Sequence, residues 1–135
     1  MIEIGFSARN ILIVGVRKIN REEEFFIKEN RITRISANQL RENIEETCEV
    51  IMEFSQGKEL YVSLDFSVLD PAFAPATTFN EVGGLTSREM IYLIQRINKM
   101  KSLKVLDIVE IDSEKDKSHG NLTVKLGAKI LSELI

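Results

Sequence analysis

The chain has 135 residues, of which 44% are hydrophobic, so it can bury one ordinary core and we expect a single domain over residues 1–135. Its 18 basic and 21 acidic residues give a net charge of −3, which excludes the basic surface typical of proteins that bind nucleic acid or anionic membranes. No apolar run approaches the roughly 18 residues of a membrane span, and the N-terminal segment lacks the layout of a secretory signal. These features predict a cytoplasmic protein. The single cysteine, Cys48, excludes an internal disulfide.

Short apolar runs alternate with helical periodicity along the chain, which is typical of a parallel α/β sheet. The first run, Ile11 to Val16, is continuously apolar and predicts a central strand covered on both faces. Asn20 and Glu23 have the spacing of a capping box, which predicts a helix ending near Asn30. A second strand is expected from Ile32 to Ile35.

The middle of the chain repeats this alternation. Ser36 and Gln39 form a second capping box, and apolar residues then recur every three or four positions as far as Phe54, which predicts one continuous helix. A third strand is expected from Leu60 to Phe66. The segment from Ser67 to Gly84 contains both prolines and is long for a connection, so we expect a packed, functional loop.

The last third of the chain predicts two more helices and one more strand. Thr86 and Glu89 form a third capping box, a strand is expected from Val105 to Ile111, and a final helix begins near Leu122 after a charged turn. The sequence therefore predicts four βα units. Ligands of open parallel sheets bind at the carboxyl ends of the strands. The polar residues expected there are Arg17, Asp65, Ser67, Glu110 and Asp112.

Two of these carboxylates suggest chemistry. Asp65 follows an apolar strand, where a carboxylate is a natural ligand for a hard cation, although it also suits a turn cap. Glu110 stands at the end of the fourth strand on the side that strand alternation assigns to Ile108. Asp70 precedes a proline and is better explained as a residue that orders the loop. His119 lies in a polar turn and is expected to face solvent.

The run SLDFSVLDPAFAPATTFNEVGG, residues 63–84, resembles the last signature of the arginase/agmatinase (ureohydrolase) family. That signature reads Ser-apolar-Asp-apolar-Asp, three residues, Pro, three residues, Pro, a small residue, seven residues and Gly. The matching positions are Ser63, Asp65, Pro71, Pro75, Ala76 and Gly84. Ser67 occupies the position of the second aspartate. The segments NILIVGVRKINREEE and GGLTSREMIYLIQRI are also similar to family segments, and nearly the whole chain aligns with the C-terminal half of a ureohydrolase.

The resemblance implies a three-layer α/β/α fold with a mainly parallel sheet, half of which is present here. In the family, both aspartates bind a pair of manganese ions, so Asp65 marks a retained ligand position and Ser67 a lost one. The LDIVE segment resembles an arginase segment whose glutamate binds the substrate's guanidinium, which implies a substrate-binding role for Glu110. The catalytic residues stay unassigned. Ureohydrolases commonly form trimers or hexamers.

Several family features are missing from the sequence. The other four metal ligands of ureohydrolases lie in a Gly-Gly-Asp-His segment and an Asp-Ala-His-x-Asp segment, and neither occurs here. The loop also departs from the family's Thr-Gly-Thr-Pro-Glu, which is replaced by residues 77–81, Thr-Thr-Phe-Asn-Glu. One carboxylate cannot hold the two ions that activate the attacking water.

Three hypotheses follow. The first is a truncated or degenerate relative that is non-catalytic alone and binds no manganese. The second is a subunit of a split binuclear-manganese enzyme that hydrolyses agmatine or arginine to urea, with the missing ligands supplied by another chain. The third is a binding module for guanidino compounds that uses Glu110. In all three, half a sheet exposes a strand edge, so we expect a homo-oligomer or a partner chain that covers it.

Overall fold

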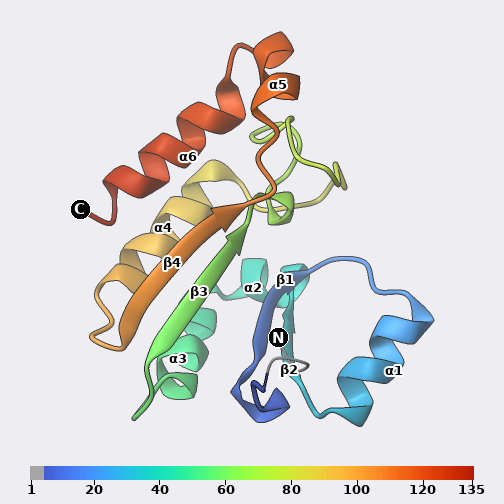
Figure 1. Cartoon of the computed structure of the whole chain (residues 1–135), viewed down its shortest axis with the longest axis vertical. Coiled ribbons are helices and arrows are strands. Elements are labelled where there is room, and N and C mark those ends of the chain that lie inside the picture. The colour runs from blue at the N-terminus through green and yellow to red at the C-terminus, as the bar shows by residue number, and fades with distance from the viewer. Residues whose placement is uncertain (1–4) are drawn as a thin grey trace.

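The structure, a computed structural model, describes residues 5–135 and shows four parallel strands arranged as two separate pairs (Figure 1). Within each pair the strands are parallel, as the βα alternation predicts, and within the described residues the two pairs share no ladder. The first pair consists of β1 (Leu12–Val16) and β2 (Thr33–Ser36), and the second of β3 (Leu60–Asp65) and β4 (Leu103–Val109).

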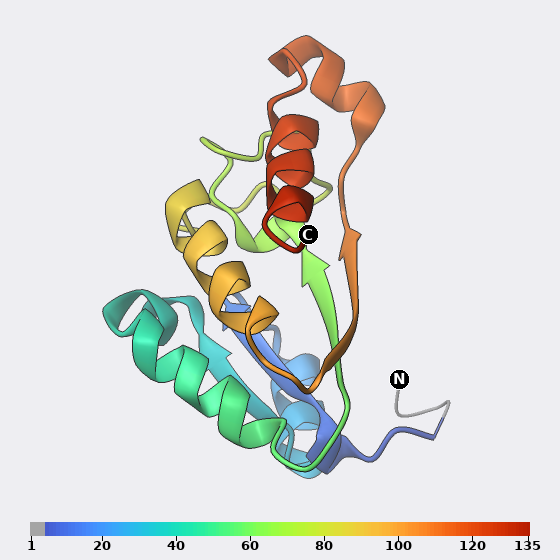
Figure 2. The same ribbon diagram turned by 90° about the vertical axis from the view of Figure 1, so that its left-hand side faces the viewer.

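Six α-helices connect and cover the strands of the described chain: α1 (Arg21–Glu29), α2 (Ala37–Glu42), α3 (Ile44–Phe54), α4 (Ser87–Asn98), α5 (Ser113–Asp116) and α6 (Leu122–Ser132). Figure 2 shows α3, α4 and α6 together on one side of β3 and β4. The three predicted capping boxes, which begin at Asn20, Ser36 and Thr86, are all formed. No helix in residues 5–135 is long and apolar enough to cross a membrane.

The continuous helix predicted from Ser36 to Phe54 is wrong, because the chain breaks at Asn43. This residue adopts φ −149° and ψ 85°, and its side chain accepts the backbone N–H of Glu46 to begin α3. Asparagine favours such local hydrogen bonds over the helix interior, and the apolar periodicity that runs through the break conceals it.

The strand predictions need two corrections. The fourth strand begins earlier than predicted, because Leu103 pairs with Leu60 and Lys104 is an extra residue in the register, and it ends at Val109, because Glu110 adopts φ 65°. The expectation that residues 11–16 form a central strand is also wrong for the described residues, since β1 pairs with β2 alone and most of its side chains are only half-buried.

The core lies between the strands and the layer of α3, α4 and α6. Its most deeply buried members include Phe66, Leu85, Met90, Ile94 and Ile130. Alternate side chains of β3 point the other way, so Leu60 and Leu64 are buried whereas Tyr61 is 44% exposed. This exposed face of β3 and β4 carries no helix in Figure 2.

Candidate functional site

The candidate site begins at Asp65, the last residue of β3. One oxygen of its carboxylate, Oδ1, accepts both the backbone N–H of Ser67 at 2.8 Å and the hydroxyl of Ser67 at 2.6 Å. The carboxylate thereby caps the short 3-10 helix Phe66–Val68 that leads into the loop. Asp65 therefore performs the turn-capping role that the sequence left open beside cation binding, and Ser67 supplies both hydrogen bonds.

Glu110 lies immediately beyond the neighbouring strand. Asp65 is in register with Val109, so Glu110 follows one residue past this cross-strand pair. Its backbone adopts φ 65°, a left-handed conformation that costs a non-glycine residue roughly 1–2 kcal/mol. Its carboxylate oxygen Oε2 is buried and has no hydrogen-bond partner in the described part of the chain. A strained backbone and an unsatisfied buried acceptor coincide at one residue, as they often do at binding sites.

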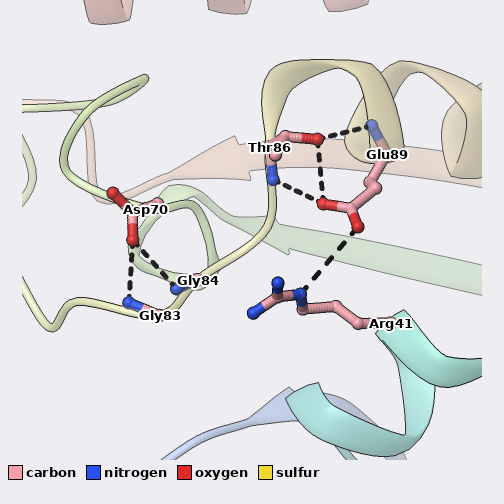
Figure 3. A network of polar contacts seen from close by, with 6 residues as sticks. All are labelled: Arg41, Asp70, Gly83, Gly84, Thr86 and Glu89. Carbon is pink, nitrogen blue, oxygen red and sulfur yellow. Dashed lines mark hydrogen bonds and ion pairs between the residues drawn. The ribbon is translucent and has the colours of Figure 1, made fainter.

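Asp70 holds the two ends of the long loop together. Its Oδ1 accepts the N–H of Ala72 at 3.0 Å, and its Oδ2 accepts the N–H groups of Gly83 at 2.7 Å and Gly84 at 3.3 Å (Figure 3). These backbone donors, that of Ala72 first, hold the pKa of the carboxyl below its ordinary value. Asp70 therefore orders the loop, as its position before a proline indicates.

The close approach of the two loop ends also requires a glycine at position 84. A Cβ at this position would lie 2.4 Å from the backbone nitrogen of Asp70 and 2.4 Å from the carbonyl carbon of Leu69. The loop ends are also joined directly, because Asp70 N–H donates to the carbonyl of Leu85 at 2.9 Å. The glycine of the signature is thus explained by two backbone segments in contact.

Arg17 ties β1 to this loop. Its guanidinium donates hydrogen bonds to the backbone carbonyls of Ser67 and Glu81. Beside it, Gly15 is buried with φ 85°, and a Cβ there would lie 2.4 Å from Cγ2 of Val68. The end of β1 and the start of the loop therefore pack against each other, although β1 and β3 share no ladder within residues 5–135.

The start of α4 completes the surroundings of the loop. Figure 3 shows the capping box of Thr86 and Glu89, in which the Glu89 carboxylate accepts the Thr86 N–H at 2.7 Å and its hydroxyl at 2.8 Å. The other oxygen of Glu89 lies 4.0 Å from the guanidinium of Arg41, at the end of α2. Loop, α2 and α4 are thereby linked at the carboxyl ends of the strands.

Asp112, which was predicted at this edge, and His119, which was predicted to face solvent, make local hydrogen bonds. Asp112 accepts the N–H groups of Glu114 and Lys115 and begins α5. His119 is exposed, as expected, and its ring contacts Ser118 and the carbonyl of Lys115. Neither residue contributes a side chain to the edge formed by Asp65 and Glu110.

One polar pair was missed by the sequence reasoning. The hydroxyl of Tyr61 donates to Oδ2 of Asp107 at 2.5 Å, on the face of β3 and β4 opposite the core. This bond raises the pKa of Tyr61 and lowers that of Asp107. Oδ1 of Asp107 is buried without a partner among the described residues. Strand alternation places Tyr61 and Ser63 on one face, but only the register reveals that Asp107 is opposite Ser63.

The donor set does not fit a binuclear metal centre. Among residues 5–135, no three His, Cys, Asp or Glu side chains lie where they could hold one ion together. Oδ1 of Asp65 is already occupied by the two donors of Ser67, and the serine offers a hydroxyl where a second carboxylate would be needed.

Comparison with known proteins agrees with this architecture. A model of the arginase family matches residues 1–135. Human arginase-1 is 32% identical over 87% of this chain and 38% of its own length, and the agmatinase of Bacillus subtilis is 32% identical over 93% of this chain and 41% of its own. The arginase of Entamoeba histolytica, solved in complex with L-ornithine, superposes with a TM-score of 0.87 at 27% identity, covering 96% of this chain and 44% of that one.

The chain therefore spans about two fifths of the length of the curated relatives that it matches. The match includes both strand pairs, the long loop and the helices that flank it, and it bears out the resemblance of residues 63–84. On the family model and on the fold, the chain belongs to the arginase family.

Proposed function

We propose that this chain is an arginase-family protein that does not hydrolyse guanidino compounds by itself. The observation that supports the proposal is the pairing of Asp65 with Ser67, in which the residue at the second aspartate position donates its hydroxyl to the carboxylate that is retained. A hydroxyl that donates to Asp65 occupies a lone pair of the carboxylate and contributes no second anion. The two-ion activation of water needs several anionic or imidazole ligands, which the described residues do not assemble.

The test is metal loading together with urea release. The purified chain is incubated with Mn²⁺, passed through a desalting column and analysed for bound metal, and urea is measured after incubation with arginine or agmatine. We expect no stoichiometric manganese and no urea above the buffer control. Stoichiometric manganese, or urea release that disappears in Asp65→Asn, would overturn the proposal. The Bacillus subtilis agmatinase serves as the positive control for both assays.

A second function, the binding of a guanidino compound, is favoured by Glu110. Its buried Oε2 has no partner in the described residues, and its left-handed backbone is retained at an energetic cost. A guanidinium presents paired N–H donors that suit a carboxylate and would satisfy this oxygen. The neighbouring acids differ from Glu110, because Asp65, Asp70 and Asp112 all accept hydrogen bonds from their own loops.

Calorimetry with matched ligands tests this second function. Agmatine and putrescine share the amine and the carbon chain but differ in the guanidinium, and arginine and ornithine form the equivalent pair. We expect heat of binding with agmatine or arginine, and loss of binding in Glu110→Gln. Equal binding of putrescine, or no heat with any of the four compounds, would remove this function while leaving the proposal on hydrolysis intact.

A further inference from the structure

The sheet of this chain is interrupted between β1 and β3. In both views the strands follow the order β4, β3, β1, β2, and the carboxyl ends of all four point toward the end of the molecule that holds the long loop (Figures 1 and 2). β1 bonds to β2 on one edge and β3 bonds to β4 on one edge, while within residues 5–135 the two facing edges share no ladder. We call these two facing, unpaired edges the strand gap.

The helix layer beneath the strand gap is continuous. α3 and α4 contact each other, and α2 packs on β1. Side chains of both pairs enter the same core, Leu12 and Val14 from β1 and Leu60 and Leu64 from β3. The two pairs are therefore held in position by the helices that they share and, beyond their carboxyl ends, by the bonds of Arg17 to the loop, rather than by a ladder between them.

The two pairs superpose together on solved arginases. The superposition on solved arginases includes 96% of this chain, hence both pairs at once, at a TM-score of 0.87, yet it accounts for only 44% of the solved chain. If the pairs had closed onto each other, the two halves of the chain would not superpose together at this score. A segment of the remaining 56% can therefore lie where this chain leaves the strand gap.

The hydrogen bonds between β3 and β4 show which backbone N–H groups of β3 face the strand gap. The N–H of Leu60 donates to the carbonyl of Ser102 at 2.8 Å, on the β4 side. Hydrogen-bonding groups alternate between the two edges of a strand, and the extra residue of the register lies on β4, so β3 itself is regular. The N–H groups of Tyr61 and Ser63 therefore face the strand gap.

We propose that the strand gap binds one extended strand of a partner polypeptide that carries the part of the arginase fold which this chain does not cover. The strand would pair with β1 and β3 at once. Toward the helices it needs apolar side chains, to pack beside Val14 and Leu64, and toward the opposite face it meets Tyr61 and Ser63 and tolerates polar ones.

A second copy of this chain does not suit the strand gap. A strand that lies between two others must have both of its own edges free, whereas each strand of this fold already uses one edge. Copies could still associate through the outer edges of β2 and β4. A partner chain therefore suits this surface better than a second copy does, and its binding requires neither Glu110 nor a metal ion.

The test uses the unmatched portion of the Bacillus subtilis agmatinase as the partner probe, co-expressed with this chain. The agmatinase's own matched portion, co-expressed with the same probe, is the positive control for assembly. We expect a 1:1 complex in which hydrogen exchange slows in β1 and β3 and does not change at the outer edges of β2 and β4. The inference would be overturned if hydrogen exchange slowed at the outer edges of β2 or β4 instead. It would also be overturned if this chain formed no complex with the probe under conditions in which the positive control assembles.

A pair of variants at one residue sharpens the test. Ser63→Pro removes an N–H that faces the strand gap and leaves the bonds to β4 intact, so we expect at least a tenfold weaker complex. Ser63→Ala removes the hydroxyl, keeps the N–H, and should bind as the unchanged chain does. If Ser63→Pro fails to fold, the exchange pattern of the unchanged chain still decides. Because no readout involves urea or manganese, failure here is distinguishable from failure of the proposed function.

Discussion

Ser67 donates both its backbone N–H and its hydroxyl to one oxygen of Asp65, at 2.8 and 2.6 Å. By the resemblance of residues 63–84, these two residues correspond to the two aspartates of the family signature, and here they form a donor and an acceptor rather than two anions. The result is a strand-to-loop connection held by two hydrogen bonds to one carboxylate.

A second carboxylate at position 67 should allow weak manganese binding, which can be measured as a rise in melting temperature. In Ser67→Asp, two carboxylates lie side by side and repel each other, so we expect a lower melting temperature without metal. Added Mn²⁺ should raise the melting temperature of this variant, by about 4 °C for each kcal/mol of binding energy in a chain of this size. Ser67→Asn, which adds the same shape without charge, should show no shift. An equal shift in the unchanged chain would contradict this account.

Substitution of Glu110 should separate stability from binding. Glu110→Gly relieves the cost of φ 65°, so we expect the free energy of unfolding to rise by about 1 kcal/mol. Glu110→Ala removes the same carboxylate but keeps the backbone strain, and serves as the control. Both variants should lose heat of binding with agmatine. Urea unfolding that shows Glu110→Gly no more stable than Glu110→Ala would argue against strain at this position.

Gly15 should tolerate alanine much less well than Gly57 does. Both glycines have positive φ, 85° and 71°, but a Cβ at Gly15 meets Val68 at 2.4 Å and a Cβ at Gly57 meets nothing within 4 Å. We expect Gly57→Ala to cost about 1 kcal/mol and Gly15→Ala about 3 kcal/mol, since the second adds overpacking to strain. Val68→Ala should recover part of the loss in Gly15→Ala. Equal costs at the two glycines would show that the contact is unimportant.

The loop closure by Asp70 should depend on pH. Since the folded-state pKa lies below the ordinary value of 3.8, the ionised carboxylate contributes stability above that value and loses it as the pH falls through the folded-state pKa. We therefore expect Asp70→Asn to melt at a lower temperature than the unchanged chain at pH 7. The difference should shrink below pH 3.8. Thermal unfolding at both pH values checks this, and a difference independent of pH would contradict it.

Much of the secondary structure followed from local signals. The capping boxes that begin at Asn20, Ser36 and Thr86 fix three helix starts, because each is made by residues three apart whose hydrogen bonds need no tertiary contact. The helix from Ser36 was expected to be continuous, and the break at Asn43 shows the limit of periodicity. The apolar residues on both sides of Asn43 contact one core, so the pattern continues although the helix does not.

The sequence predicts which residues form the candidate site, but it does not predict how their backbone and side chains are arranged. The spacing of residues 63–84 places Asp65, Ser67 and Gly84 in a known signature, and strand order places Glu110 at the same edge. No sequence pattern shows that Ser67 bonds to Asp65 or that Glu110 leaves the strand with φ 65°, because both depend on where the chain turns after the strand ends.

The sequence by itself determined the family, the βα alternation and the presence of Ser67 at a position where the family signature has an aspartate, since these depend on residue identity and spacing along the chain. Only the tertiary structure decided that the strands form two pairs, because strand pairing is a long-range choice and the helices hold β1 and β3 apart without a ladder between them. The same long-range packing buried Oε2 of Glu110 with no partner among residues 5–135, whereas the bonds from Ser67 to Asp65 are local and join residues two apart.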